Sequence, residues 1–88
     1  MATATVNLYD KTGANQANLS SLSWAWFDTF PTTTSVASTD AGTAESTDAN
    51  GQLALTLTNS TLTSGQTGWL LLYDSTGTKV GAYTVAVD

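Results

Sequence analysis

The stretch LSWAWF (residues 22–27) places bulky and small side chains in alternation, with Leu22, Trp24 and Trp26 on one side. Such a two-residue period is typical of a β-strand with one face against a core. Truncating a buried tryptophan to alanine typically costs about 3–5 kcal/mol, and a small chain without cysteine needs contributions of that size. We therefore predict that Trp24 packs between two sheets. For Trp26, which is nearer the end of the run, the pattern does not decide between a place in the core and a place on a contact surface.

The same period recurs along the chain, whereas no window shows the 3.6-residue apolar period of an amphipathic helix. The run 68–74 is apolar on both faces, as a central strand is, and we predict that Trp69 near its start is a core residue. About seven short strands predict an all-β fold, a single antiparallel β-sandwich formed by one domain over residues 1–88. The expected strands lie at 3–9, 22–27, 32–38, 42–47, 52–58, 68–74 and 79–87.

Three near copies of an Asp-x-x-Gly turn occur, in the stretches YDKTG (9–13), TDANG (47–51) and YDSTG (73–77). Asp at the first turn position accepts backbone N–H groups two residues on, and Gly supplies the positive φ that ends the turn. A calcium loop would need several oxygen ligands in alternation and a later Glu, whereas each turn supplies one carboxylate. Because the chain also lacks histidine and cysteine, we predict hairpin corners and neither a metal nor a cofactor.

The charge of the chain excludes several classes of partner. Only two of the 88 residues are cationic, Lys11 and Lys79, and the net charge is −5. Nucleic acids and anionic membranes both require a basic surface, so neither is predicted as a partner. A charged share of 10%, far below the usual quarter, favours a place within an assembly or outside the cell. The start, MATATVNLYD, lacks a basic segment followed by an apolar run, so we predict no signal peptide and synthesis in a cytoplasm.

Catalysis is not predicted either. The chain has no histidine, cysteine or arginine, so its serines and threonines have no ordinary activator. With the turn aspartates set aside, Asp28, Asp40 and Glu45 remain, and a glycosidase would need two of them facing each other across a cleft. A domain of this size rarely encloses such a cleft, so we predict that the protein is not an enzyme.

Two kinds of protein resemble this chain. The order LYDKTGANQANLSSLSWAWFD (8–28) and GTAESTDANGQLAL (42–55) is similar to the start of a carboxypeptidase-regulatory or transthyretin-like sandwich. In a short, acidic, cysteine-free chain, WAWFD (24–28), TDANG (47–51) and GWLLLYD (68–74) together resemble small virion proteins of tailed bacteriophages. Those are Ig-like or related β-sandwich proteins that decorate or cement the capsid. The resemblance implies an Ig-like or transthyretin-like fold and a non-enzymatic protein on the capsid surface, with the major capsid protein and further copies of itself as partners.

A decoration protein needs contact residues, and side chains without an evident place in the core are the candidates. Phe27 lies on the reverse face of its run, and Phe30 and Pro31 fall in the least patterned segment, 28–43. The extended N-terminus could pair along the edge of a neighbouring strand. The predicted partner interface therefore comprises Trp26, Phe27, Phe30 and Pro31, together with Ala2, Thr3, Ala4 and Thr5.

Two other functions stay open. The tryptophans could form a stacking platform in a carbohydrate- or receptor-binding module of a phage tail fibre, a spike or a cell-surface protein. The chain could instead be a designed or excised Ig-like domain whose function lies in a longer protein. Binding to capsids or to glycans would distinguish the decoration hypothesis from the adhesion hypothesis.

Overall fold

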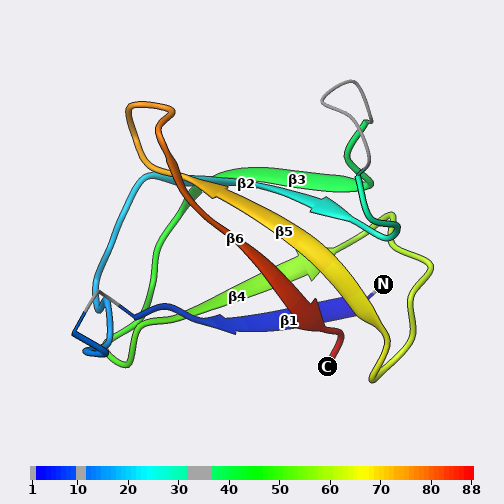
Figure 1. Ribbon diagram of the computed structural model, residues 1–88, viewed down its shortest axis with the longest axis horizontal. Helices are drawn as coiled ribbons and strands as arrows, with labels where there is room; N and C mark the ends of the chain where they lie inside the picture. Colours follow the sequence, from blue (N-terminus) through cyan, green and yellow to red (C-terminus); the bar gives the residue numbers. More distant parts are fainter. Residues whose placement is uncertain (1, 10–11, 32–36) are drawn as a thin grey trace.

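The chain folds into strands and connecting loops (Figure 1). The computed structural model describes residues 2–9, 12–31 and 37–88. These residues form no helix long and apolar enough to cross a membrane. The prediction of an all-β fold is confirmed, since every regular element in these ranges is a strand. The strands are β1 (Ala2–Asn7), β2 (Leu22–Phe27), β3 (Asp40–Glu45), β4 (Gln52–Leu57), β5 (Thr67–Tyr73) and β6 (Lys79–Ala86).

The described residues form six strands, whereas the sequence predicts about seven. Six of the expected runs reappear within two residues of their bounds, and the largest shift is that of the run 42–47, since β3 begins and ends two residues earlier. The remaining run, 32–38, lies mostly outside the described residues, and Ala37 and Ser38 are not in a strand. The finer assignment to an Ig-like or transthyretin-like sandwich stays a prediction.

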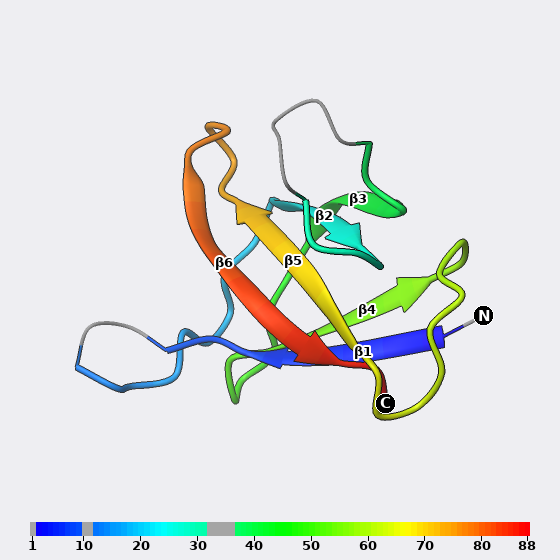
Figure 2. The ribbon, with the colours of Figure 1, turned by 45° about the vertical axis from the view of Figure 1, so that its right-hand side comes forward.

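Two antiparallel sheets make up the fold, one in the order β1-β4 and one in the order β3-β2-β5-β6. Their strands run in crossing directions, as the turned view shows (Figure 2). The sheets meet at one side, where Ala4 bridges Val87 and the N–H of Asp88 donates to the carbonyl oxygen of Thr3 at 2.9 Å. The first and last parts of the described chain are therefore neighbours in space.

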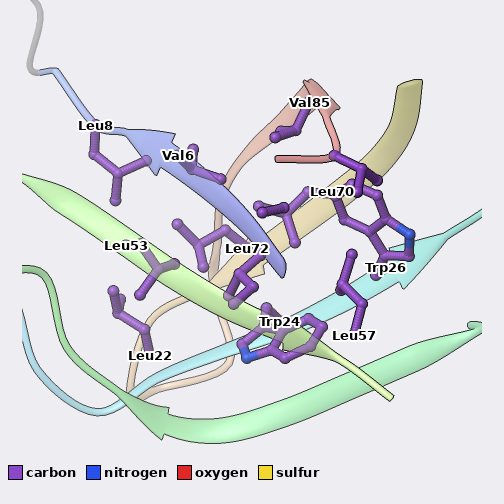
Figure 3. Packing of buried hydrophobic residues seen from close by; sticks show 13 residues of the cluster. Val6, Leu8, Leu22, Trp24, Trp26, Leu53, Leu57, Leu70, Leu72 and Val85 are labelled. Atoms are coloured by element: carbon purple, nitrogen blue, oxygen red, sulfur yellow. The ribbon is translucent and has the colours of Figure 1, made fainter. Parts of the chain in front are cut away.

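The core lies between the two sheets and contains both tryptophans of β2 (Figure 3). Trp24 is 6% exposed, which confirms its predicted place in the core, and Trp26 is completely buried. The Leu face of β4 is buried too, as its alternation predicts. Removing apolar surface from water at roughly 25 cal/mol per Å² is the main term that stabilises such a core. Its other members are Ala4, Val6, Leu8, Leu22, Leu53, Leu55, Leu57, Leu70, Leu72, Val85 and Val87.

Both indoles depend on a glycine in the neighbouring strand. Gly42 of β3 lies against the ring of Trp24, and Gly68 of β5 lies against the ring of Trp26. A Cβ at either position would overlap the indole that it faces. A glycine inside a strand usually weakens it, but it permits a close approach. Pairing the largest side chains with the smallest therefore fills the space between the sheets.

The two Asp-x-x-Gly turns whose aspartate is described have the predicted turn chemistry, but only the turn at 73–77 is a hairpin corner, between β5 and β6. The turn at 47–51 joins β3 to β4, which lie in different sheets, so its prediction as a hairpin corner is wrong. The Asp48 carboxylate accepts the N–H groups of Asn50 and Gln52 at 2.8 and 3.0 Å, and Gly51 has a φ of +75°. Asp74 accepts from Thr76 and Thr78 in the same way, and the Thr76 hydroxyl and N–H together with the Thr78 N–H lower its pKa. Asp10, in the third turn, lies outside the described residues.

Candidate partner-binding groove

The outer face of the four-stranded sheet carries apolar side chains, where a sandwich often presents polar ones to water. In the strand registers, Trp69 of β5 lies opposite Phe27 of β2. Leu71 lies between Ala25 on one side and Ala82 on the other. Trp69 and Leu71 are each half-buried. Residues of three adjacent strands thus form one apolar surface outside the core.

The chain that follows β2 reaches this surface. Phe30 contacts Trp69 edge-to-face, with ring centroids 5.7 Å apart and ring planes at 69°, a favourable geometry for an aromatic pair. Phe30 nevertheless stays 62% exposed, and Pro31 beside it has no backbone donor to leave unpaired. A groove of about 300 Å³ lies here, lined by Phe30, Pro31, Trp69, Leu70, Leu71, Ala82, Tyr83 and Thr84.

The chemistry of the groove is apolar. The described residues that line it include no charged side chain, and Tyr83 and Thr84 are the polar members of the set. A tyrosine phenol is uncharged at neutral pH, and burial raises the pKa of the Tyr83 phenol further above its ordinary value. A sugar or a phosphate needs several well-placed polar groups to fix its orientation. The groove is therefore better suited to an apolar side chain of another protein.

The structure corrects the predicted interface at Trp26 and Phe27. Trp26 points into the core and donates its indole N–H to Asp28 Oδ1 at 3.0 Å. Phe27 does lie on the reverse face, but Trp69 lies beside it and its exposed fraction is only 7%. Neither side chain has enough exposed surface to anchor a partner, whereas Phe30 and Pro31 border the groove and stay candidates.

Trp69 was predicted to be a core residue because its strand is apolar on both faces, and that prediction is wrong. In a fold of two layers, one face of β5 must point away from the core. The alternation buries Leu70 and Leu72 between the sheets and leaves Trp69 half-buried outside. The sequence did indicate that one apolar face of this strand lies outside the core. A strand that is apolar on both faces needs a cover on each side, and a sandwich of two sheets covers only one.

The N-terminal part of the predicted interface lies in β1. Ala4 is completely buried, so its side chain is unavailable to a partner, and Ala2 is half-buried. Thr3 and Thr5 are exposed, and their hydroxyls donate to Asp88 Oδ2 at 3.1 and 3.2 Å. One edge of β1 pairs with β4, and the other meets residues 87–88. The strand is thus engaged within its own chain instead of extending freely toward a neighbour.

Two of the carboxylates that a glycosidase could have used hold one loop in place. Asp28, which follows β2, accepts the hydroxyl of Ser60 at 2.6 Å and the N–H of Thr61 at 2.8 Å. Asp40, at the start of β3, is buried and accepts the N–H of Asn59 at 2.9 Å. Together they fasten the β4–β5 connection to β2 and β3. These hydrogen bonds give both carboxylates a structural role.

These contacts should make part of the stability depend on pH. Burial raises the pKa of Asp28, but hydrogen bonds from Ser60, Thr61 and Trp26 together outweigh it and lower the pKa below its ordinary value. The associated stability is present above the unfolded-state pKa of about 3.9 and is lost as the pH falls through the lower folded-state value. We expect Asp28→Asn to lower the free energy of unfolding by about 2 kcal/mol at pH 7. Because the variant has no carboxylate to protonate at this position, its free energy of unfolding should fall less than that of the wild type as the pH drops below about 4.

Urea denaturation at a series of pH values from neutral to strongly acidic measures both effects. Glu45→Gln is the control, because the carboxylate of Glu45 lies outside this network of hydrogen bonds. An acid response of the same size in the wild type and in Asp28→Asn would contradict the role given to Asp28.

The groove and its aromatic rim are the strongest candidate site in the part of the chain that the structure describes. No group of three or more His, Cys, Asp or Glu residues that could hold a metal ion occurs in the same ranges. Comparisons with protein-family models, with curated proteins and with solved structures found no match for this chain.

Proposed function

We propose that this protein is a non-enzymatic binding protein that attaches to the outside of an assembled bacteriophage capsid and reinforces or decorates it. The observation that carries the proposal is the apolar, uncharged groove rimmed by Phe30 and Trp69. Burying such a surface against another protein releases water and leaves no charge unpaired. The virion setting rests on the resemblance of WAWFD (24–28) and GWLLLYD (68–74) to phage proteins of that kind.

Phe30 is the proposed anchor of this contact. Its ring is largely exposed, and its edge-to-face contact with Trp69 restrains it before a partner arrives. A restrained aromatic side chain loses less conformational freedom on binding, which favours affinity. Each copy needs only a modest affinity for the major capsid protein when linked copies engage several capsid sites together. Attachment of this kind requires shape complementarity and no chemical step.

Binding to capsids that lack the protein tests this proposal. We expect Phe30→Ala to weaken co-sedimentation with such capsids by roughly 30-fold, the effect of removing an aromatic hot spot. Tyr9→Ala is the matched control, because Tyr9 is also a largely exposed aromatic residue and does not line the groove. We expect the control to bind within about twofold of the wild type, as residues outside a hot spot do.

The heat resistance of the capsids gives a second measurement. Added wild-type protein should raise the temperature at which the capsids disrupt, and Phe30→Ala should raise it less. Failure of the wild type to sediment with capsids, or binding without any gain in heat resistance, would overturn capsid reinforcement. Equal binding by the wild type and Phe30→Ala would remove the groove from the contact.

A carbohydrate- or receptor-binding module is the second candidate, because Trp69 and Phe30 present aromatic surface at the groove. Sugars stack on such rings but also require directed hydrogen bonds, for which Thr84 is the exposed polar side chain in the lining. Glycan binding that disappears in Trp69→Ala, with an unchanged circular dichroism spectrum, would favour adhesion. Trp26 is unsuitable for this test because it is completely buried.

A further inference from the structure

The groove borders on the outer edge of a strand. Ala82, Tyr83 and Thr84, which form part of its lining, belong to β6. In the order β3-β2-β5-β6, β6 is an outer strand of the four-stranded sheet, and it forms the rim of the molecule in Figure 2. A partner that enters the groove therefore comes within reach of backbone groups as well as apolar side chains.

Two residues of β6 direct their backbone groups away from β5. The N–H of Val87 donates to the carbonyl oxygen of Gln66, on the β5 side, at 2.8 Å. From there the register with β5 is unbroken over residues 81–86. Because alternate residues of an antiparallel pair direct both backbone groups at the partner strand, Thr84 and Ala82 direct theirs outward. No described strand pairs with them there.

Both ends of this edge are unsuited to a further strand. At the C-terminal end, Ala4 of β1 already bridges Val87. At the other end, the register with β5 shifts between Leu72 and Tyr73, next to Lys79. A register shift and a lysine both discourage pairing at an edge. The open stretch is therefore short, and it coincides with the residues that line the groove.

A strand added to this stretch would place side chains over the groove. Residues directly opposite one another in a sheet share a face, so those opposite Ala82 and Thr84 point to the outer face, where Trp69 lies. Ala82 and Thr84 are small and exposed, so a large side chain can extend across them toward the aromatic rings. The groove volume of about 300 Å³ is at the lower limit for small-molecule pockets, which suits one such side chain.

The charges around the stretch indicate the charge of the partner. The net charge of the chain is −5. Asp74 lies in the turn before β6 and Asp88 follows the strand, while Asp28 precedes the rim residue Phe30 by two positions. Lys79 is the one cationic side chain among the described residues. A second copy or an acidic segment is therefore repelled, whereas Lys or Arg residues on either side of the paired part of a partner are attracted.

We propose that the groove receives an extended segment of the major capsid protein, which adds as a strand to the β6 edge at Ala82 and Thr84. Main-chain hydrogen bonds to these two residues supply affinity, and one large apolar side chain of the segment enters the groove beside Trp69. Neutral residues form the paired part, and Lys or Arg residues flank it. This inference rests on the proposed attachment through the groove and specifies how the partner's chain is held.

Co-sedimentation with capsids that lack the protein tests the inference. Thr84→Pro removes an outward N–H without touching the bonds to β5. We expect it to weaken binding roughly 10-fold, because one main-chain hydrogen bond is lost and its acceptor stays unpaired. Thr84→Val is the matched control, because it keeps that N–H and the shape of the side chain, and it should bind within about twofold of the wild type. Added salt should weaken binding by the wild type, since it screens the attraction of the basic flanks.

Amide hydrogen exchange of the wild type decides the matter if Thr84→Pro does not fold. The amides of Ala82 and Thr84 should become protected on the capsid, while those of β3, the other outer strand of the same sheet, should not change. Failure of the wild type to sediment with capsids would overturn the proposed function and this inference together.

A different result would overturn the added strand alone. In that case the wild type binds and Phe30→Ala weakens binding, but a folded Thr84→Pro binds as well as the wild type or the amides of Ala82 and Thr84 stay unprotected. The groove is then the contact without pairing along β6. Binding that does not weaken with added salt would overturn the basic flanks.

Discussion

Trp26→Ala is expected to lower the free energy of unfolding by about 4 kcal/mol, a large share of the stability of a small domain. The indole is completely buried, so its removal leaves a cavity that the surrounding strands can fill only in part. The same substitution removes the N–H that donates to Asp28, and Asp28 in turn holds the β4–β5 connection at Thr61. Loss of packing and loss of the hydrogen bond therefore act in the same direction.

Trp69→Ala is the matched control for this prediction, because the same atoms are removed from a ring that is half-buried outside the core. We expect a loss of about 1–2 kcal/mol, in proportion to the smaller area that the ring buries. Urea unfolding followed by far-ultraviolet circular dichroism measures both variants without relying on tryptophan fluorescence. A Trp26→Ala chain that does not fold agrees with the prediction, whereas equal losses in the two variants would contradict it.

Gly68→Ala is expected to cost about 3 kcal/mol, although it adds a single methyl group. The new Cβ would overlap the indole of Trp26, which is enclosed on all sides and fixed by its bond to Asp28. The strand backbone or the ring must move to make room, and both are packed. Urea unfolding of this variant gives the cost directly.

Trp26→Phe provides the control, because a smaller ring leaves space for the added methyl group. The double variant Gly68→Ala with Trp26→Phe should be more stable than the sum of the two single losses predicts. We expect a coupling energy of about 1–3 kcal/mol in a double-mutant cycle, the range found for residues in contact. Strictly additive losses would show that the methyl group and the indole do not meet.

Local patterns in the sequence were sufficient to predict the strands and much of the core. The alternation in LSWAWF (22–27) predicted β2 with its bounds, and the Leu face of β4 followed from the same rule. Turn chemistry at Asp48 and Asp74 was also predictable, because an Asx turn and its glycine are formed within five residues. In all of these the physical cause lies close along the chain.

The candidate site was less predictable because it depends on contacts between distant segments. Phe27 was correctly placed on the outer face of its strand, but its burial depends on Trp69, more than forty residues later. Trp69 was assigned to the core since its own strand does not reveal which face meets the second sheet. The structural roles of Asp28 and Asp40 depend likewise on a loop that the sequence pattern leaves unassigned.

The position of β1 has a consequence for how the nascent chain folds on the ribosome. Ala2–Asn7 is synthesised before both of the segments that it pairs with, Gln52–Leu57 and residues 87–88. It must leave the exit tunnel and wait, unpaired, until both of those segments have also emerged. Such long sequence separations slow folding, and they delay completion of the sheets until residues 87–88 have emerged.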